Sequence, residues 1–324
     1  MSRDSRLFTA TGRQVVIAVN PTAGASETAK AAEELKSALE TLGYIARTES
    51  SIQEIRRLAG EMGEDLRCVV AAGGDGTIAL LANELPARTT LALLPQGTEN
   101  LLAKYLGVPW AAAEAAAVMH RGLGARLDAG EANRQLFLVM SSCGFDARVV
   151  HQVHKARKGH IRHWAYAKPI VDSIRKYRYP TLNIHLDDDP EPVRVKWAFV
   201  FNAPRYAMGL PIAEEADAMD GLLDLCGFRG GNLVNGLLYL TGIVLRQHRS
   251  WQDTTLRQAR RIRIEADEPV PYQIDGDPGG HLPVEIRVVP QRLSILVPES
   301  WAHRYRLAPG DESAHQNPRE EPLT

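Results

Sequence analysis

The feature that most constrains the fold is an alternation of short apolar runs with longer helix-forming segments in the first part of the chain. The run at residues 14–20 leads into SETAKAAEELKSALETL, and three further pairs of apolar run and helical segment follow before Met119. Strands that alternate with helices in this way build parallel βα units, and several such units form a doubly wound sheet. The sequence therefore predicts an α/β domain over residues 13–124.

The pattern changes near Gly122, after which short strand-like runs are separated by turn residues. Helical stretches interrupt these runs at about 169–178 and 233–248. Many short strands with turns between them are typical of a sandwich or a barrel. We therefore expect a β-sandwich domain over residues 125–307, in which LSILVPES and WAHRYRL are candidates to return to the first domain. The polar residues 308–324 are expected to form a disordered tail.

Composition limits the classes of partner. The 324 residues include 38 basic and 39 acidic side chains, so total charge does not favour nucleic acid, and no nucleic-acid-binding motif is present. The three cysteines are widely spaced and form neither a disulfide framework nor a zinc pattern. The first residues lack an apolar signal sequence, which predicts a cytoplasmic protein. LVNGLLYLTGIVL, from Leu233, is too short and too interrupted to span a bilayer.

Three glycines surround one aspartate in the sequence AAGGDGT, where a predicted strand turns into a helix. Gly73, Gly74 and Gly76 remove side chains at the edge of the sheet where ligands bind in such folds. Glycine permits positive φ and close approach of a ligand, and free N–H groups at a helix N-terminus bind anions. Asp75 would repel a phosphate there unless a cation lay between them, and Mg²⁺ is the expected cation.

Two other interpretations of this loop remain open. Asp75 could serve only as a helix cap, since aspartate is a favoured N-cap residue. The stretch from Gly74 to Ala79 also matches the dinucleotide fingerprint G-x-G-x-x-A. That match lies in the third βα unit rather than the first and lacks the expected downstream acid, which argues against a dinucleotide site.

Several further motifs, taken together, resemble the diacylglycerol and sphingosine kinases. They are NPTAG at 20–24, GGDGT at 73–77, PQGTEN at 95–100, GFDA at 144–147, the segment from Asn202 to Asp224 that ends in DGLLD, and QIDGDP at 273–278. GGDGT alone is also found in NAD kinases and phosphofructokinases, whereas the ordered set extends from Val15 to Val297. The resemblance implies a nucleotide-binding α/β domain, a β-sandwich that carries the lipid site, and ATP- and Mg²⁺-dependent transfer of phosphate to a lipid hydroxyl.

The same resemblance implies roles for individual residues. The nucleotide-binding positions would be Asn20, Pro21, Thr22, Ala23, Gly24, Thr48, Gly73, Gly74, Asp75, Gly76, Thr77, Gly97, Thr98 and Asn100. Asp75 would also hold Mg²⁺, and Asp277 stands where the family has a glutamate that accepts the proton of the attacking hydroxyl. In a regular strand Asp275 and Asp277 would face the same side, although an ordinary acidic turn is the alternative.

A structural Mg²⁺ is implied as well. Asp220 would bind it through its side chain, and Asp217 and Leu222 through backbone oxygens, whereas the alternative is a solvated acidic turn.

Some positions depart from the family pattern. Ala79 and Leu80 replace an amide and a carboxylate, Leu101 replaces an aspartate common in bacterial diacylglycerol kinases, and Asp277 is one methylene shorter than glutamate. Glu99 is a candidate to restore some negative charge. These departures leave two rival hypotheses: a soluble-metabolite kinase similar to NAD kinases, and an inactive homologue that binds nucleotide or lipid.

The segment from Lys155 to Arg178 holds eight basic residues and one acid, with three aromatic residues interleaved. A basic aromatic segment of this kind suits peripheral contact with an anionic membrane, where a lipid substrate resides. The alternative is a solvated basic face. His151 and His154 in the preceding stretch lack further metal ligands and are expected to be surface residues. The sequence makes no prediction of oligomeric state.

Overall fold

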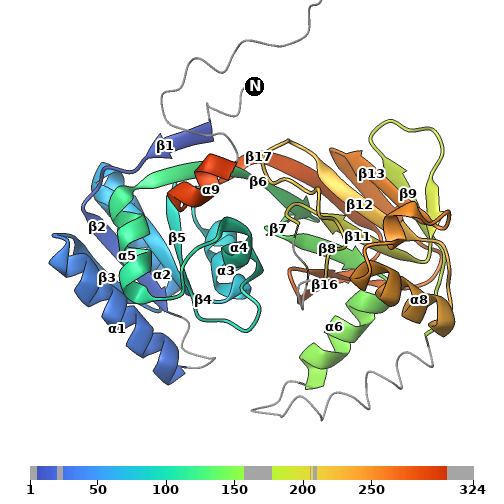
Figure 1. The fold of residues 1–324 in the computed structure, drawn as a ribbon, viewed down its shortest axis with the longest axis horizontal. Coiled ribbons are helices and arrows are strands. Elements are labelled where there is room, and N and C mark those ends of the chain that lie inside the picture. Colours follow the sequence, from blue (N-terminus) through green and yellow to red (C-terminus); the bar gives the residue numbers. More distant parts are fainter. Residues whose placement is uncertain (1–5, 20–24, 157–176, 205, 207–209, 305–324) are drawn as a thin grey trace, which may run out of the picture.

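The computed structural model describes residues 6–19, 25–156, 177–204, 206 and 210–304. Within these residues, the strands form two sheets and the molecule has two lobes joined by long strands (Figure 1). The predicted α/β domain followed by a β-sandwich is confirmed.

The first lobe is a doubly wound parallel sheet. Its strands are β2 (Gln14–Val19), β3 (Ile45–Glu49), β4 (Leu66–Gly73) and β5 (Leu91–Pro95), in the spatial order β5-β4-β2-β3. Its helices are α1 (Ala25–Thr41), α2 (Ile52–Met62), η2 (Gly63–Asp65), α3 (Asp75–Glu84), α4 (Leu101–Leu106) and α5 (Ala112–Arg121).

Both faces of this parallel sheet are buried. Val15 and Ile17 of β2 pack in a core with residues of α1 and α5, whereas Val16 and Ala18 pack in a core with residues of α2 and α3. Successive side chains of a strand point to opposite faces, so a parallel sheet covered on both sides needs a continuous apolar run. The apolar runs of the sequence therefore encode the doubly wound arrangement.

The second lobe packs two antiparallel sheets face to face. One consists of β8 (Met140–Cys143), β11 (Trp197–Phe201), β12 (Leu223–Phe228), β13 (Thr254–Ala259), β15 (Pro271–Ile274) and β16 (Asp277–His281), in the order β13-β12-β11-β8-β15-β16. The opposing layer consists of β9 (Leu182–Leu186), β10 (Val193–Val195), β14 (Arg261–Glu265) and part of β17 (Val284–Leu296). Residues of both layers, such as Val200 and Ile262, share one core.

In the described part of the second lobe, three helical elements accompany the sandwich, namely α6 (Phe145–Ala156), α8 (Leu233–Val244) and η5 (His248–Ser250). The helical stretch expected near 233–248 is thus confirmed. The one expected near 169–178 lies mostly outside the described residues.

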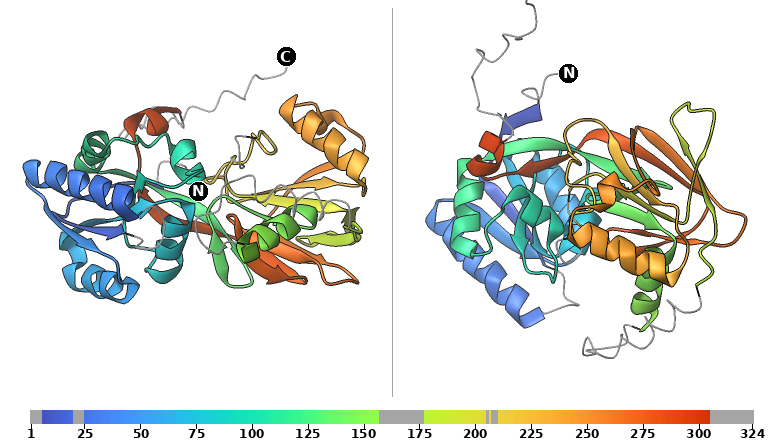
Figure 2. Two further views of the ribbon diagram at one scale, coloured as in Figure 1. Left: turned by 90° about the horizontal axis from the view of Figure 1, so that it is seen from below. Right: turned by 45° about the vertical axis from the view of Figure 1, so that its right-hand side comes forward.

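Two long strands connect the lobes. β6 (Leu123–Ala132) pairs antiparallel with β17 from Ile286↔Ala132 to Leu296↔Gly124, with an irregularity between Val289 and Leu293. β1 (Leu7–Thr9) and β7 (Gln135–Phe137) also pair with β6. Figure 2 shows this pair passing from one lobe to the other.

The end of β17 belongs to the first lobe. Ile295 pairs in parallel with Leu91 of β5, and α9 (Glu299–Arg304) follows β17 in the chain. Trp301 of α9 is fully buried, and its ring packs edge-on against Tyr105 with centroids 6.0 Å apart.

A buried carboxylate fixes the strand pair. Asp128 of β6 is 1% exposed, and its Oδ1 accepts hydrogen bonds from the Arg6 guanidinium and the Gln291 backbone N–H, both at 2.7 Å. Its Oδ2 accepts from the backbone N–H of Gly221 at 2.8 Å. The carboxylate therefore joins the N-terminal segment, the irregular part of β17 and the loop before β12.

Replacing Asp128 by Ala should lower the free energy of unfolding by about 3–5 kcal/mol, because the Arg6 charge would stay buried without its partner. Denaturant unfolding would measure this change. Asp188→Ala is the control, since Asp188 pairs with Arg261 at 2.9 Å but its side chain is 93% exposed, and it should cost less than about 1 kcal/mol. Equal losses in the two variants would contradict the role given to Asp128.

Candidate functional site

The predicted nucleotide loops gather at one edge of the parallel sheet. Gly73–Thr77 follows β4, Pro95–Asn100 follows β5, and Thr48 lies near the end of β3. The carboxyl ends of parallel strands meet at the same edge, which is where ligands bind in such folds. Thr48 and Thr98 are exposed there. The predicted positions Asn20, Pro21, Thr22, Ala23 and Gly24 lie outside the described residues, directly after β2.

The glycines of these loops allow two loops to touch. A Cβ on Gly97 would clash with the Cα of Gly74, and a Cβ on Gly74 would lie 3.0 Å from the Cα of Gly97. A side chain on Gly73 would clash with the hydroxyl of Thr77. Positive φ is not the reason for glycine here, since Gly74 has φ −95°. Close backbone packing between the loops requires these glycines.

Asp75 and Asn100 hold the same pair of loops together. Asp75 is the first residue of α3, but its carboxylate accepts hydrogen bonds from the N–H groups of Leu101 and Leu102 in α4, at 2.9 and 3.1 Å. Asn100, in a left-handed conformation, exchanges two side-chain hydrogen bonds with the backbone of Gly97. Asp75 thus caps a helix, although not the one that it begins.

These groups are compatible with a nucleotide and Mg²⁺. The helix α3 directs its free N–H groups toward the loop edge, where phosphate would bind. The Asp75 oxygens have about four acceptor sites, and two of them are used by α4. In the described part of the chain, no cluster of three or more His, Cys, Asp or Glu could hold a metal ion. Mg²⁺ would therefore depend on phosphate oxygens and water besides Asp75, which is its usual mode with nucleotides.

A hairpin from the second lobe reaches this loop. Asp275 and Gly276, with φ 47° and 88°, form the turn between β15 and β16, and Asp277 follows as the first residue of β16. Its Oδ2 lies 3.9 Å from where a Cβ of Gly76 would stand. The structure therefore brings Asp277 to the start of α3, across the boundary between the lobes.

His154 is a neighbour of Asp277 that the sequence did not single out for this site. Its Nδ1 lies 4.0 Å from Oδ1 of Asp277, and both side chains are about half exposed, at 55% and 56%. The spacing of His154 within α6 gives no signal of this contact, because the partner is distant in sequence.

The expectation that Asp275 and Asp277 share one face is wrong. The turn interrupts the strand, so the alternation of a regular strand does not apply. Asp275 points instead at the backbone N–H groups of Leu138, Val139 and Met140, which donate to it at 2.7, 3.0 and 2.9 Å. Asp275 and Gly276 thus form a turn, and the catalytic role of Asp277 stays a prediction.

Burial raises the pKa of Asp275 to about 6, and the nearby charge of Asp75 adds to this rise. The three N–H donors act in the opposite direction, because they stabilise the ionised form. The effect of burial on the pKa of Asp275 is larger than that of the three donors.

Hydrogen bonds of other motif residues stabilise the β15–β16 hairpin. The amide oxygen of Gln273 accepts from the N–H of Gly276 at 2.8 Å, and its Nε2 donates to the hydroxyl of Ser142 at 2.9 Å. Asp146, of the GFDA motif, accepts from the hydroxyls of Ser142 and Tyr206. Burial raises the pKa of Asp146. Sequence reasoning missed this support, although the GFDA and QIDGDP motifs marked the positions.

The acidic loop before β12 shows local hydrogen bonding. Asp220 accepts from the N–H of Leu222 at 2.9 Å, and Asp217 accepts from the N–H of Met219 at 3.1 Å. The Tyr105 hydroxyl of the first lobe lies 3.5 Å from Asp217. The structural Mg²⁺ site at Asp217, Asp220 and Leu222 stays a prediction.

The departures from the family pattern lie beside the loops. Leu80 is 48% exposed on α3. Leu101 contributes its N–H to Asp75, so the backbone there has a defined role. Glu99, the candidate to restore negative charge, forms an ion pair with Lys104 at 3.6 Å.

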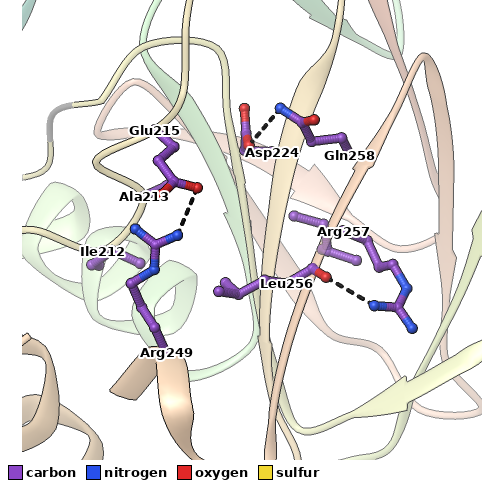
Figure 3. A pocket seen from close by; sticks show the side chains of 9 residues that line it. Ile212, Ala213, Glu215, Asp224, Arg249, Leu256, Arg257 and Gln258 are labelled. Carbon is purple, nitrogen blue, oxygen red and sulfur yellow. Dashed lines mark hydrogen bonds and ion pairs between the residues drawn. The ribbon is translucent and has the colours of Figure 1, made fainter. Parts of the chain in front are cut away.

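A separate cavity of about 350 Å³ lies on β12 and β13 (Figure 3). It is lined by Ile212, Ala213, Glu215, Asp224, Leu225, Arg249, Leu256, Arg257 and Gln258. Burial raises the pKa of Asp224 to about 6, helped by nearby acidic residues. β11 and β8 separate these strands from the β15–β16 hairpin, so the cavity lies apart from Asp277.

Comparison with known families agrees with this division of the molecule. Residues 14–132 match the diacylglycerol kinase catalytic domain, and residues 139–297 match the YegS C-terminal NAD kinase beta sandwich-like domain. The first lobe is therefore similar to the catalytic domain of diacylglycerol kinases, and the second to the sandwich domain of the YegS type. Together the two matches account for most of the described residues.

Curated relatives are similar over most of the chain. The diacylglycerol kinase of Bacillus subtilis (strain 168) is 24% identical over 295 residues, which cover 89% of this chain and 97% of that protein. The diacylglycerol kinase of Mycobacterium tuberculosis (strain ATCC 25618 / H37Rv) is 26% identical and covers 88% and 95%, respectively. An uncharacterized Synechocystis protein is 25% identical over 73% of this chain. The matched region covers 56% of that protein's length.

Solved structures show the same fold. Two chains from Bacillus anthracis str. Sterne superpose with TM-scores of 0.68 and 0.64, at 23% and 19% identity, and the second is described as a diacylglycerol kinase. Both cover 89% of this chain and 98% of their own. At this level of identity the likeness establishes the fold alone.

Gly97→Ala should lower the free energy of unfolding by about 1–3 kcal/mol, because the added methyl group displaces the loop at Gly74. Gly60→Ala on α2 is the control, as a Cβ there meets nothing within 4 Å, and it should stabilise the protein by about 0.5–1 kcal/mol. Thermal unfolding of both variants would measure the effects. A Gly97 variant as stable as the wild type would show that the loops need not touch.

Loss of the Asp275 proton should lower the free energy of unfolding of the wild type by about 2–3 kcal/mol as the pH rises from about 4 to about 7. In this window the native state keeps the Asp275 proton up to a pKa of about 6, whereas the unfolded chain loses it near 3.8. Asp275→Asn lacks this loss, so its stability relative to the wild type should rise across the window. Denaturant unfolding at several pH values would measure the difference. A difference that moves in the other direction would mean that the three N–H donors prevail over burial.

Proposed function

We propose that this protein is an ATP- and Mg²⁺-dependent lipid kinase. It transfers the γ-phosphate of ATP to a hydroxyl of diacylglycerol, a sphingoid base or a related lipid. The observation that carries the proposal is the position of Asp277, whose carboxylate faces the start of α3 at Gly76. A carboxylate of one lobe thus lies beside a glycine-rich loop of the other, and the similarity to diacylglycerol kinases makes phosphate transfer the chemistry that we propose.

The residues supply positioning and charge, which are the main contributions of a protein to phosphoryl transfer. The N–H groups at the start of α3 would bind phosphate oxygens. The loop at Gly97, Thr98 and Asn100 would border the opposite side of the phosphates. Asp75 would hold Mg²⁺ directly or through water. When bound, Mg²⁺ would neutralise the charge of the phosphate oxygens.

Asp277 would accept the proton of the lipid hydroxyl. As the hydroxyl oxygen bonds to the γ-phosphorus, the bond from that phosphorus to the bridging oxygen breaks and ADP leaves, while the hydroxyl proton moves to the carboxylate. Asp277 is shorter than the glutamate of the family, and the hairpin turn at Asp275 and Gly276 places it against α3. The supporting hydrogen bonds of Gln273 would keep the carboxylate in this position.

The acceptor lipid implies contact with a membrane. The predicted contact through Lys155–Arg178, at the inner surface of the cytoplasmic membrane, falls mostly outside the described residues and stays a prediction.

A soluble-metabolite kinase is the second candidate, because the sandwich domain matches a model described as NAD kinase-like. An inactive homologue is the third, because Leu80 and Leu101 stand where relatives carry carboxylates.

Purified protein incubated with γ-labelled ATP, Mg²⁺ and micelles of a total lipid extract should produce a labelled lipid. Asp277→Asn should lower the rate by about a hundred- to ten-thousand-fold, because the proton acceptor is lost. Asp75→Asn should also lower it, whereas Asp277→Glu should retain activity. Asp188→Asn, at an exposed site between β9 and β10, is the matched control and should behave as the wild type.

The same assay separates the alternatives. With NAD added to the assay, labelled NADP in place of labelled lipid would identify a soluble-metabolite kinase. ATP binding in equilibrium dialysis without transfer to any acceptor would identify an inactive homologue, and either result would overturn the proposal.

A further inference from the structure

The helix α8 exposes an apolar surface. Val234, Leu238, Val244 and Leu245 are 66%, 54%, 58% and 57% exposed, and they make up half of the large exposed apolar side chains in the described part of the chain. Val234, Leu238 and Leu245 follow the helical repeat, so they lie along one side of the helix. We call these three residues, together with Val244 in the last turn, the α8 apolar face. Exposed apolar residues gathered in this way mark an interaction site.

Packing on the inner side fixes the orientation of the helix. Tyr239 is 2% exposed, and a Cβ on Gly236 would lie 3.0 Å from the Trp197 ring. A Cβ on Gly242 would clash with the ring of Trp251. Since two glycines and a buried tyrosine already face the aromatic core, the helix cannot rotate to bury its outer side chains. The exposure of the α8 apolar face is therefore a property of the folded lobe.

The surroundings of the helix match a membrane surface. The sequence from Leu233 to Leu245 contains no charged residue. Arg229 is exposed before the helix, and Arg246 is exposed directly after it, where it pairs with Glu214 at 3.1 Å. A helix with an apolar face and basic residues at its ends suits the boundary between lipid headgroups and acyl chains.

The helix is rigidly linked to the lobe that carries Asp277. Ring contacts connect Phe145, at the start of α6, to Trp197 at 5.3 Å and Trp197 to Tyr239 of α8 at 6.2 Å. The other end of α6 carries His154, beside Asp277. Figure 1 and the left view of Figure 2 place α8 on the sandwich lobe, away from the α/β lobe. A partner bound to the α8 apolar face would therefore not cover the predicted nucleotide loops.

We propose that the α8 apolar face docks on an anionic phospholipid bilayer and inserts its side chains among the acyl chains. No helix in the described part of the chain has the length and apolarity needed to cross a bilayer. The proposal rests on the proposed function, because a lipid acceptor resides in a bilayer. It assigns docking to a surface other than the segment Lys155–Arg178.

A fluorescent label at Leu238 tests the insertion. Leu238→Cys, labelled with an environment-sensitive dye, should become brighter and shift to the blue with vesicles of phosphatidylcholine and phosphatidylglycerol. The native Cys68, Cys143 and Cys226 are buried, and burial raises their thiol pKa values, so the label should react with the new cysteine. Ile45→Cys is the matched control, since Ile45 is 56% exposed on the α/β lobe. A label at Leu238 that does not respond, or responds no more than one at Ile45, would overturn the proposal.

Charged variants test the contribution to binding. Leu238→Asp and Leu245→Asp should each weaken vesicle binding in flotation assays by about tenfold or more, whereas Ile45→Asp should leave it unchanged. Circular dichroism would verify that the variants fold. Without lipid, the fluorescence shift of the label could grow with protein concentration, and sedimentation could show dimers that Leu238→Asp abolishes. These two results together would mean that a second copy of the chain covers this face, and they would overturn docking on lipid.

The outcome is separable from that of the kinase proposal. Vesicle binding requires no turnover, so Asp277→Asn should bind vesicles as the wild type does. Leu238→Asp should lose activity toward long-chain diacylglycerol in vesicles and retain it toward a dispersed short-chain lipid. If the wild type phosphorylates no lipid while the Leu238 label still enters the bilayer, the kinase proposal falls and the docking surface stands.

Discussion

The pairing of β6 with β17 is the constraint on which the rest of the structure depends. Each strand contributes to both lobes, so the lobes are joined by a ladder of backbone hydrogen bonds rather than by a flexible linker. Asp128 fixes the irregular part of this ladder, where the chain bends. The distance between α3 and the β15–β16 hairpin is therefore set by secondary structure. The same strand pair thereby holds Asp277 near Gly76.

The loops at the sheet edge show how one residue can serve folding and chemistry together. Asp75 satisfies two N–H groups of α4 and still offers acceptor sites to a cation. Gly74 and Gly97 permit the contact that aligns the two loops. The conformation of the site is thus maintained by hydrogen bonds and packing within the protein, which reduces the ordering that a bound nucleotide would have to impose.

Much of the fold could be predicted from the sequence, because its determinants are local. The apolar runs at β2, β4 and β5 indicate buried parallel strands, and the motif order indicates the two domains. Local patterns do not show which distant backbone groups a side chain meets. For this reason the sequence misplaced Asp275, whose carboxylate is held by Leu138, Val139 and Met140. It also gave no sign that Gly74 needs glycine because of Gly97, or that Val234 and Leu238 of α8 stay exposed.

The return of β17 to the first lobe has a consequence for how the chain acquires its structure during synthesis. Domains generally fold as units as they emerge from the ribosome, with the N-terminal one first. Here Ile295 completes the sheet beside Leu91, and Trp301 fills the core beside Tyr105. The α/β lobe therefore cannot reach its final packing until nearly the whole chain has been released. The nascent protein must carry an unfinished α/β lobe while its sandwich is being made.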